Sequence, residues 1–163
     1  GVQNMVKDLR SFPMLAEMDS KDLDKLSDLM KQENFSAGSR IIEEGDIGDT
    51  MYLLVDGTVD ILKTTLYGEE YVCATLKDEY SCVFGEIALI DHDRRSATVR
   101  AKTDCRTFSI TAADFQKYCQ EYPAVGCRLL MFIATNLCRN LRAENENLLK
   151  VYQALVDEIE NED

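Results

Sequence analysis

Length and charge already limit the functions open to this chain. Its 163 residues suffice for one domain with a sizeable core, and 18 Lys and Arg against 30 Asp and Glu give a net charge of −12. A chain with this negative charge repels nucleic acid and anionic membrane surfaces on average. We therefore expect no nucleic-acid partner and no membrane attachment. The sequence shows no secretion signal and no apolar run of about 18 residues, which predicts a cytoplasmic protein.

The cysteine and histidine pattern argues against a metal site. No Cys-x-x-Cys spacing occurs, and His92 is the only histidine. Several cysteines fall where apolar residues would recur, which predicts small buried thiols in a reducing compartment. The six are Cys73, Cys82, Cys105, Cys119, Cys127 and Cys138.

Residues 1–34 are predicted to form an N-terminal helical segment. Apolar residues recur at helical spacing over residues 1–18, with an interruption at Pro13. Asp19 and Ser20 then offer a cap for a second helix, predicted over 21–33, in which apolar residues recur every three or four positions.

Residues 35–111 are predicted to be a β domain, because the apolar period changes to two after Gly38. Asp56-Gly57 between two such segments predicts a two-residue hairpin, and Tyr67-Gly68-Glu69 marks a second turn. Many short strands with turns between them favour a barrel or jelly roll. The predicted strands are 40–43, 51–55, 58–64, 70–76, 98–102 and 105–110.

Residues 112–163 are predicted to be helical. Thr111 offers a cap for a helix over 112–121, with Phe115 and Tyr118 on its buried face. Pro123 then restarts the helix, and residues 124–160 fit one long helix of about 55 Å or two closely joined ones.

The long C-terminal helix has a partial heptad pattern. One heptad position holds only apolar residues, namely Ala134, Leu141, Leu148 and Leu155. A partner position, containing Leu130, Leu137, Glu144, Val151 and Glu158, is broken by two glutamates. Two interpretations stay open: a homodimer through this helix, or a helix that folds over its own domain.

The stretch from Phe84 to Val99 carries the chemistry. Gly85 lets backbone N–H groups approach a ligand, the Glu86-Ile87-Ala88 that follows suits a short helical turn, and such a turn attracts an anion. Arg95 offers a planar fork that fits phosphate oxygens, Ser96 a hydroxyl, and Glu86 an acceptor for a ribose hydroxyl. These groups suit a nucleotide with few charges.

A simpler interpretation of the same stretch makes Gly85 a turn glycine and Glu86 with Arg95 a surface ion pair of little worth. Arg94 precedes Arg95 directly and is expected to point away from it, toward solvent.

The stretch resembles the phosphate-binding cassette of the cyclic nucleotide-binding domain family, whose pattern is Phe-Gly-Glu-aliphatic-Ala-Leu, a short loop, then Arg-(Ser/Thr/Ala)-Ala. Residues 41–59 resemble the family's second signature, a glycine-punctuated strand and loop, and the likeness covers about Leu9 to Leu141. The domain that it resembles is of the type found in catabolite activator protein, protein kinase regulatory subunits and cyclic nucleotide-gated channels. The resemblance implies an α+β fold: an eight-stranded β jelly roll with N-terminal helices and a long C-terminal helix.

The resemblance also implies a function and a set of site residues. Arg95 matches the phosphate arginine and Glu86 the acceptor for the ribose 2′-hydroxyl. The positions that match the cassette turn are Gly85, Ile87 and Ala88, and those that touch the phosphate and the base edge are Ser96 and Ala97. The implied function is a sensor that binds cAMP or cGMP and repositions its C-terminal helix. Residues of that helix would contact the base, and the positions expected near these contacts are Arg142, Glu144, Asn145 and Leu148.

Neither an enzyme nor a cofactor is expected. The chain lacks a Gly-x-x-x-x-Gly-Lys-Ser/Thr loop, and its single histidine, His92, lies in a charged loop with no nucleophile and acid arranged around it. The alternative to a sensor is a jelly-roll interaction or dimerisation module that binds no nucleotide. The preferred base, the regulated effector and whether the chain is a fragment stay open.

Overall fold

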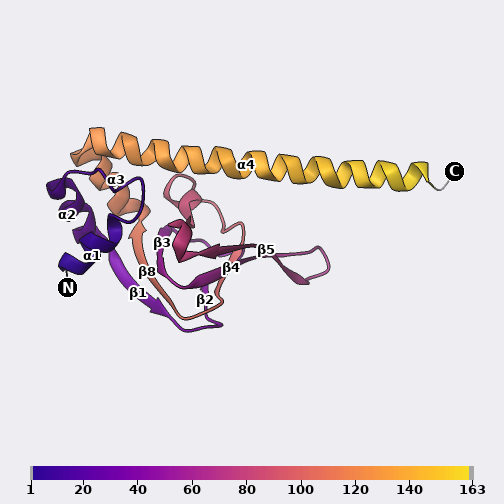
Figure 1. Ribbon diagram of the computed structural model, residues 1–163, viewed down its shortest axis with the longest axis horizontal. Coiled ribbons are helices and arrows are strands. Elements are labelled where there is room, and N and C mark those ends of the chain that lie inside the picture. The colour runs from indigo at the N-terminus through magenta and orange to yellow at the C-terminus, as the bar shows by residue number, and fades with distance from the viewer. Residues whose placement is uncertain (1, 162–163) are drawn as a thin grey trace. The chain divides into compact units, whose positions relative to one another are not determined.

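Eight antiparallel strands form two four-stranded sheets in the computed structural model, which describes residues 2–161 (Figure 1). In the first sheet the strand order is β1 (Lys31–Phe35), β8 (Cys105–Thr111), β3 (Thr50–Asp56) and β6 (Val83–Phe84). In the second it is β2 (Arg40–Ile42), β7 (Thr98–Ala101), β4 (Thr58–Thr64) and β5 (Glu70–Lys77). With the flanking helices described below, this confirms the predicted α+β jelly roll.

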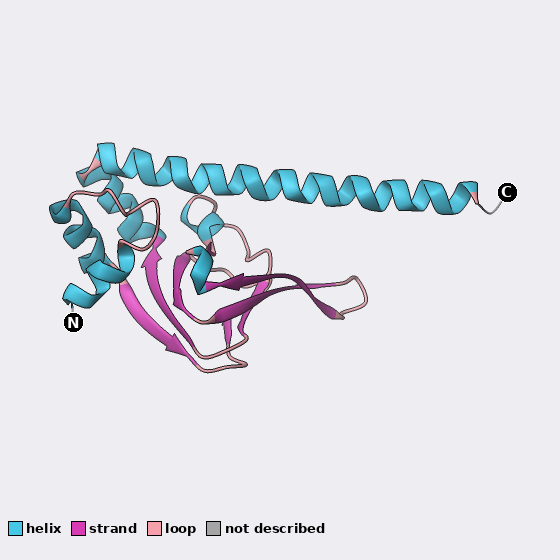
Figure 2. Cartoon of the chain, in the orientation of Figure 1, coloured by secondary structure: helices cyan, strands magenta, loops and turns pink. Residues whose placement is uncertain are grey.

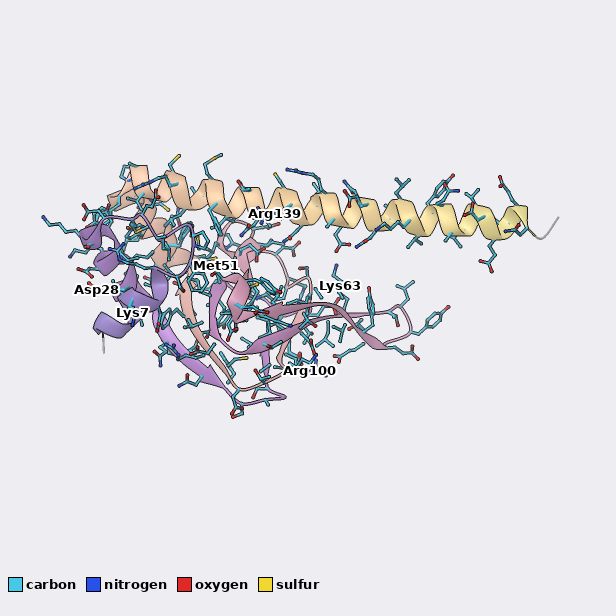
Figure 3. All side chains as sticks on the ribbon, viewed as in Figure 1. Lys7, Asp28, Met51, Lys63, Arg100 and Arg139 are labelled. Carbon is cyan, nitrogen blue, oxygen red and sulfur yellow. The ribbon has the colours of Figure 1, made fainter. Side chains whose placement is uncertain are left out.

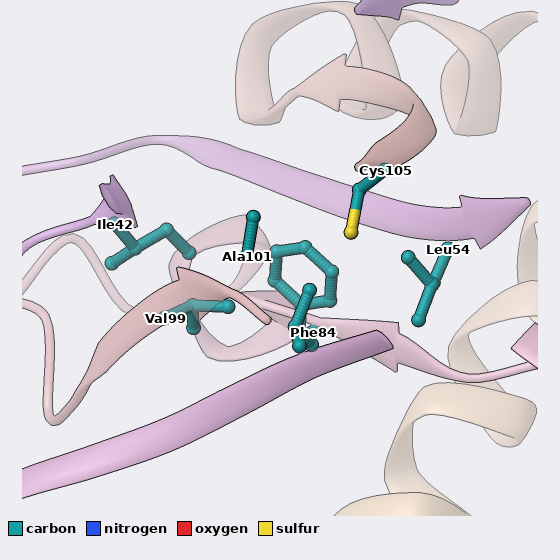
Figure 4. Packing of buried hydrophobic residues seen from close by; sticks show 7 residues of the cluster. Ile42, Leu54, Phe84, Val99, Ala101 and Cys105 are labelled. Carbon is teal, nitrogen blue, oxygen red and sulfur yellow. The ribbon is translucent and has the colours of Figure 1, made fainter. Parts of the chain in front are cut away.

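The core lies between the two sheets. Figure 4 shows a buried cluster to which both sheets contribute: Leu54, Phe84 and Cys105 from the first, and Ile42, Val99 and Ala101 from the second. Each large apolar side chain buried here stabilises the fold by about 1.5–3 kcal/mol. Met51 of β3 is also buried (Figure 3). Both sheets are therefore needed to enclose this core.

The predicted Asp56-Gly57 hairpin is wrong. β3 ends at Asp56 and β4 begins at Thr58, but β3 pairs with β6 and β8, whereas β4 pairs with β5 and β7. The dipeptide is thus a corner at which the chain passes from one sheet to the other. Gly57 has φ 101°, and its N–H donates to the carboxylate of Asp78 at 2.7 Å. Positive φ suits a sharp corner as well as a hairpin turn, which explains the error.

The second predicted turn is confirmed. β4 and β5 pair along their length, and Thr65 N–H donates to the Glu69 carbonyl at 2.8 Å across the turn. Gly68 has φ 83° there. Because β5 lies at the edge of its sheet, most of its residues are exposed.

Three helices flank the roll within residues 2–126: α1 (Val2–Leu9), α2 (Ser20–Leu29) and α3 (Ala112–Glu121). Both predicted caps are confirmed, since Asp19 accepts from Lys21 N–H at 2.9 Å and Thr111 accepts from Asp114 N–H at 3.2 Å. The predicted burial of Phe115 and Tyr118 is confirmed as well.

The helix predicted over 21–33 is too long. It ends at Leu29, and the following residues form β1, which pairs with β8 over its whole length. Charged and polar side chains dominate β1, so its apolar period gave no strand signal. Pairing with β8 satisfies its backbone groups instead.

The C-terminal helix α4 runs unbroken from Pro123 to Glu160 (Figure 2). It therefore forms one helix, the first of the two predicted alternatives. Two compact units divide the chain at Gly126, and most of α4 makes up the second. From Cys138 to Leu155 every residue of α4 is exposed.

The prediction of buried cysteines holds for Cys105 and is wrong for Cys73, Cys127 and Cys138, which are exposed. The reason is their position: Cys73 lies on the edge strand β5, and the other two lie on α4. Within residues 2–161, no disulfide forms and no group of three or more His, Cys, Asp or Glu is placed to hold a metal ion. No helix in that range has the length and apolar composition needed to cross a bilayer.

Candidate functional site

The predicted cassette turn is present between β6 and β7. β6 ends at buried Phe84, Gly85 adopts φ 73°, and residues 86–89 form the short 3-10 helix η2 (Glu86–Leu89). Ala88 and Leu89 are buried and anchor η2, and Ala88 N–H donates to the Gly85 carbonyl at 3.2 Å. The first N–H groups of a helix have no partner within it, so this turn can donate to an anion.

The loop between β2 and β3 packs against the strand-like segment before β7, which brings the two sequence motifs together. Ile47 and Arg94 form an isolated β-bridge. Gly45 N–H donates to the Arg95 carbonyl and Arg95 N–H donates to the Asp46 carbonyl, both at 2.8 Å. The backbone of Arg95 is thereby fixed by a loop about fifty residues earlier in the chain.

The side chain of Arg95 is held by carbonyl oxygens. Its Nη2 donates to the Thr50 carbonyl at 2.8 Å and its Nη1 to the Gly85 carbonyl at 3.3 Å. A Cβ on Gly48 would stand 2.7 Å from Arg95 Cζ, so only glycine leaves room for the guanidinium there. Partial burial lowers the pKa of Arg95, while the nearby Tyr52 and Asp49 raise it. No carboxylate within residues 2–161 forms an ion pair with this cation.

Glu86 is buried at the start of η2, and burial raises the pKa of its carboxyl, an effect opposed by its own backbone N–H. In the described part of the chain its side chain forms no ion pair and no hydrogen bond with another residue's side chain. The simpler interpretation, a surface ion pair of Glu86 with Arg95, is therefore wrong. Two opposite charges lie at one turn without neutralising each other.

The remaining predicted residues surround these two. Ile87 is exposed on η2, Ser96 is exposed beside Arg95, and Ala97 is half-buried. Their roles toward a ligand stay predictions. Arg94 is exposed, as expected, and its Nη1 donates to the Gly45 carbonyl at 2.8 Å, so it braces the β2–β3 loop.

Three residues of the site were not predicted: Gly48, Thr50 and Tyr52. Tyr52 stacks on Phe84 with ring centroids 5.2 Å apart and supports the strand that leads into the turn. Its pKa is raised mainly by burial, and the charge of Arg95 opposes that shift. Thr50 accepts from Arg95 through its backbone carbonyl, a group that every residue has, so the sequence does not mark this position. Gly48 belongs to the second motif, so its position was a usable signal.

Comparison with known proteins gives a consistent result. The sequence profile described as "Cyclic nucleotide-binding domain" matches residues 32–122. The chain is 36% identical over 150 residues to potassium/sodium hyperpolarization-activated cyclic nucleotide-gated channel 2 of Mus musculus, which covers 92% of this chain but only 16% of the channel. The chain thus spans less than a fifth of that relative.

Two solved structures resemble the fold. Thermus thermophilus catabolite activator protein superposes with a TM-score of 0.71 at 27% identity, covering 83% of this chain and 61% of that one. The regulatory domain of Toxoplasma gondii PKA, crystallised with cAMP, superposes with a TM-score of 0.62 at 26% identity, covering 72% and 44% of the two chains.

Proposed function

Because the chain belongs to the cyclic nucleotide-binding domain family, we propose that it senses cAMP or cGMP and passes the binding event on through its C-terminal helix. The observation that carries the proposal is the pair of unneutralised charges at η2. Removing an ionisable group from water without an opposite charge beside it costs free energy, so a purely structural turn gains nothing from the charges of buried Glu86 and partly buried Arg95. A ligand with one phosphate charge and a ribose hydroxyl supplies partners for both.

In this proposal each group has one task. Arg95 donates to the phosphate oxygens together with the N–H groups at the start of η2. Glu86 accepts from the ribose 2′-hydroxyl. The turn residues Gly85, Ile87 and Ala88 line the ribose-phosphate pocket, and Ser96 and Ala97 contact the phosphate and the base edge. One cation and a few N–H groups suffice for a cyclic phosphodiester with a single charge.

The similarity to the Toxoplasma regulatory domain, which was crystallised with cAMP, favours cAMP as the ligand. The exposed Ser96 hydroxyl is also able to meet a guanine edge, so cGMP is the competing ligand. Titration with both compounds decides between them.

The output is proposed to be a change in the position of α4. A ligand shifts such an equilibrium only by the difference in its affinity for the two arrangements. Two copies are proposed to associate through α4 into a homodimer. The proposal includes no catalysis, no metal or other cofactor and no nucleic-acid partner, and it places the protein in the cytoplasm.

Calorimetric titration with cAMP and with cGMP tests the proposal. We expect at least one to bind with micromolar or better affinity, equivalent to about −8 kcal/mol. The Arg95→Ala chain serves as the control for heat that does not arise at the site. No heat and no thermal shift at millimolar nucleotide would leave the interaction module without nucleotide binding as the better description.

A further inference from the structure

Ser96 offers an exposed hydroxyl beside the arginine proposed to bind phosphate. It directly follows the exposed Arg94 and the partly buried Arg95, and its side chain forms no hydrogen bond within residues 2–161. Arg95 donates to two backbone carbonyls but pairs with no carboxylate in the same range. A hydroxyl without a hydrogen-bond partner and a cation without a counter-charge therefore stand on neighbouring residues.

Comparison with the other hydroxyl side chains that closely follow an arginine shows what distinguishes Ser96. Besides Ser96, five serines and threonines stand one to three positions after an arginine, and the side-chain oxygen of each makes a hydrogen bond: Ser11, Thr98, Thr103, Thr107 and Ser109. Three of the five are also buried. Thr103 is exposed, but its hydroxyl accepts from Thr58 N–H at 3.0 Å and donates to the Asp104 carbonyl at 3.1 Å. Of these six hydroxyls, only that of Ser96 is both exposed and without a hydrogen bond in the described part of the chain.

We propose that Ser96 is a phosphorylation site, modified by a protein kinase that recognises the arginines before it, and that the phosphate closes the nucleotide site. In the reaction the Ser96 oxygen bonds to the γ-phosphorus of ATP, the bond from that phosphorus to the oxygen of the departing ADP breaks, and the hydroxyl proton passes to the catalytic base of the kinase. The exposed positive charge of Arg94 suits the acidic binding groups of such a kinase. What the phosphate switches off rests on the proposed function, whereas the modification itself does not.

A phosphate on Ser96 gives Arg95 a partner from its own chain. Phosphoserine carries a charge of about −1.5 to −2 at pH 7 and three acceptor oxygens. Beside arginines such a group forms charge-assisted hydrogen bonds, and the fork of Arg95 is already held in place by two carbonyls. A nucleotide phosphate that enters the site then meets an occupied arginine and a second negative charge.

The same position makes nucleotide binding and phosphorylation mutually exclusive. The family resemblance matches Ser96 to a residue that contacts the nucleotide phosphate, so a bound nucleotide covers the hydroxyl that the kinase must reach. Phosphorylation therefore lowers the affinity for nucleotide by repulsion and by occupying Arg95. Nucleotide, in turn, slows phosphorylation by covering Ser96.

A chain with phosphoserine installed at position 96 during synthesis tests the effect on binding. Calorimetric titration with cAMP and with cGMP should show about 100-fold weaker binding than in the unmodified chain, because the nucleotide loses its arginine. Treatment with a phosphatase should restore the affinity. Phosphoserine in place of Ser36, which is exposed between β1 and β2, is the matched control and should leave the affinity unchanged. Unchanged affinity with phosphoserine at position 96, or equal losses at the two positions, would overturn the switch.

Thermal unfolding without nucleotide tests whether the phosphate pairs with Arg95. We expect phosphoserine at position 96 to raise the thermal midpoint above that of the unmodified chain, and we expect the gain to disappear in the Arg95→Ala background. Arg94→Ala, which removes the neighbouring exposed arginine, is the control background and should keep most of the gain. A gain of equal size in the parent and in the Arg95→Ala chain, or no gain in either, contradicts the pairing.

Kinase treatment of the full chain tests the modification itself. The catalytic subunit of cAMP-dependent protein kinase, which selects serines preceded by arginine, should transfer phosphate from ATP to the chain, and peptide mass spectrometry should locate it at Ser96. Ser96→Ala should abolish the transfer, and Arg94→Ala should slow it. Saturating nucleotide should slow it as well. Transfer to Thr103 at the same rate, or no transfer to Ser96, would overturn the assignment.

These measurements separate the inference from the proposed function, because kinase transfer and the thermal gain need no nucleotide. Phosphorylation at Ser96 with the expected gain in thermal midpoint, while no form of the chain binds cAMP or cGMP, supports the modification site and rejects the sensor. Nucleotide binding that is equally tight in the unmodified chain and in the chain with phosphoserine at position 96 does the reverse.

Discussion

The Arg95 guanidinium lies against Gly48, so close that a Cβ on Gly48 would stand only 2.7 Å from Arg95 Cζ. Together with the carbonyls of Thr50 and Gly85, this contact holds the side chain in place before any ligand arrives. A cation that is already oriented loses less conformational entropy on binding. The β2–β3 loop is therefore part of the phosphate site.

Replacing Gly48 by alanine should weaken nucleotide binding while the fold survives. The added carbon meets the flexible end of an arginine side chain, so Arg95 moves and the backbone does not. We expect about 10- to 100-fold lower affinity, or roughly 1.4–2.8 kcal/mol, with a change in unfolding free energy of about 0.5 kcal/mol or less. Calorimetry and urea unfolding measure the two. Asp46→Ala, on the same loop and exposed, is the control; unchanged affinity in Gly48→Ala would show that the loop does not position Arg95.

Replacing Arg95 by alanine should lower nucleotide affinity by about two orders of magnitude, because the phosphate loses its charged, forked partner. The fold should persist, since partial burial already disfavours this cation. Arg94→Ala removes an exposed side chain that donates to the Gly45 carbonyl and should have a much smaller effect. Equal losses in the two variants would assign the phosphate to the wrong arginine.

Glu86→Gln should stabilise the fold at neutral pH and weaken ribose binding. Burial raises the folded-state pKa of Glu86, so the stability this group contributes is present below its unfolded pKa and is lost as pH rises through the folded one. At pH 7 the buried, ionised carboxylate of Glu86 lowers the free energy of unfolding, and the neutral amide of glutamine does not. Near pH 3 both chains carry a neutral side chain at this position. Urea unfolding at both pH values measures the difference.

Glu69→Gln, which removes an exposed carboxylate by the same substitution, is the control for that experiment. Calorimetry at pH 7 should show weaker nucleotide binding by Glu86→Gln, because a neutral amide is a poorer acceptor than a carboxylate. A Glu86→Gln chain that is less stable than the parent at pH 7 would mean that the carboxylate has a structural partner.

Gly57→Ala should destabilise the fold far more than Gly68→Ala. Both glycines have positive φ, but a Cβ on Gly57 would collide with the Asp104 carbonyl and stand 2.8 Å from Cys105 Sγ, whereas a Cβ on Gly68 meets open space. We expect roughly 3–5 kcal/mol for the first and about 1–2 kcal/mol for the second, by urea unfolding. Similar costs would argue against a tight corner between the sheets at Gly57.

Much of the binding turn could be predicted because its determinants are local. Gly85 needs positive φ, the residues after it form a helical turn, and Arg95 follows at a fixed interval. The helix caps Asp19 and Thr111 were predictable for the same reason, since a cap contacts residues two or three positions away.

Features set by distant segments could not be predicted. Asp56-Gly57 is compatible with a hairpin and with a corner, and only the pairing of β3 with β8 decides. β1 is polar and depends on β8 for its structure.

The pairing of β1 with β8 has a consequence for how the protein is made. Lys31 lies opposite Ser109, and β8 also separates β1 from β3, so the first sheet has no centre until the last strand exists. Pairings of such long sequence separation are slow to form. During synthesis, β3 cannot pair with β8 until the chain up to Thr111, the partner of Thr50, has left the ribosome. The binding turn is thus supported, through β3, by the strand that is translated last. A nascent chain truncated before Cys105 lacks the partner strand of β3, which carries the Thr50 carbonyl that accepts from Arg95.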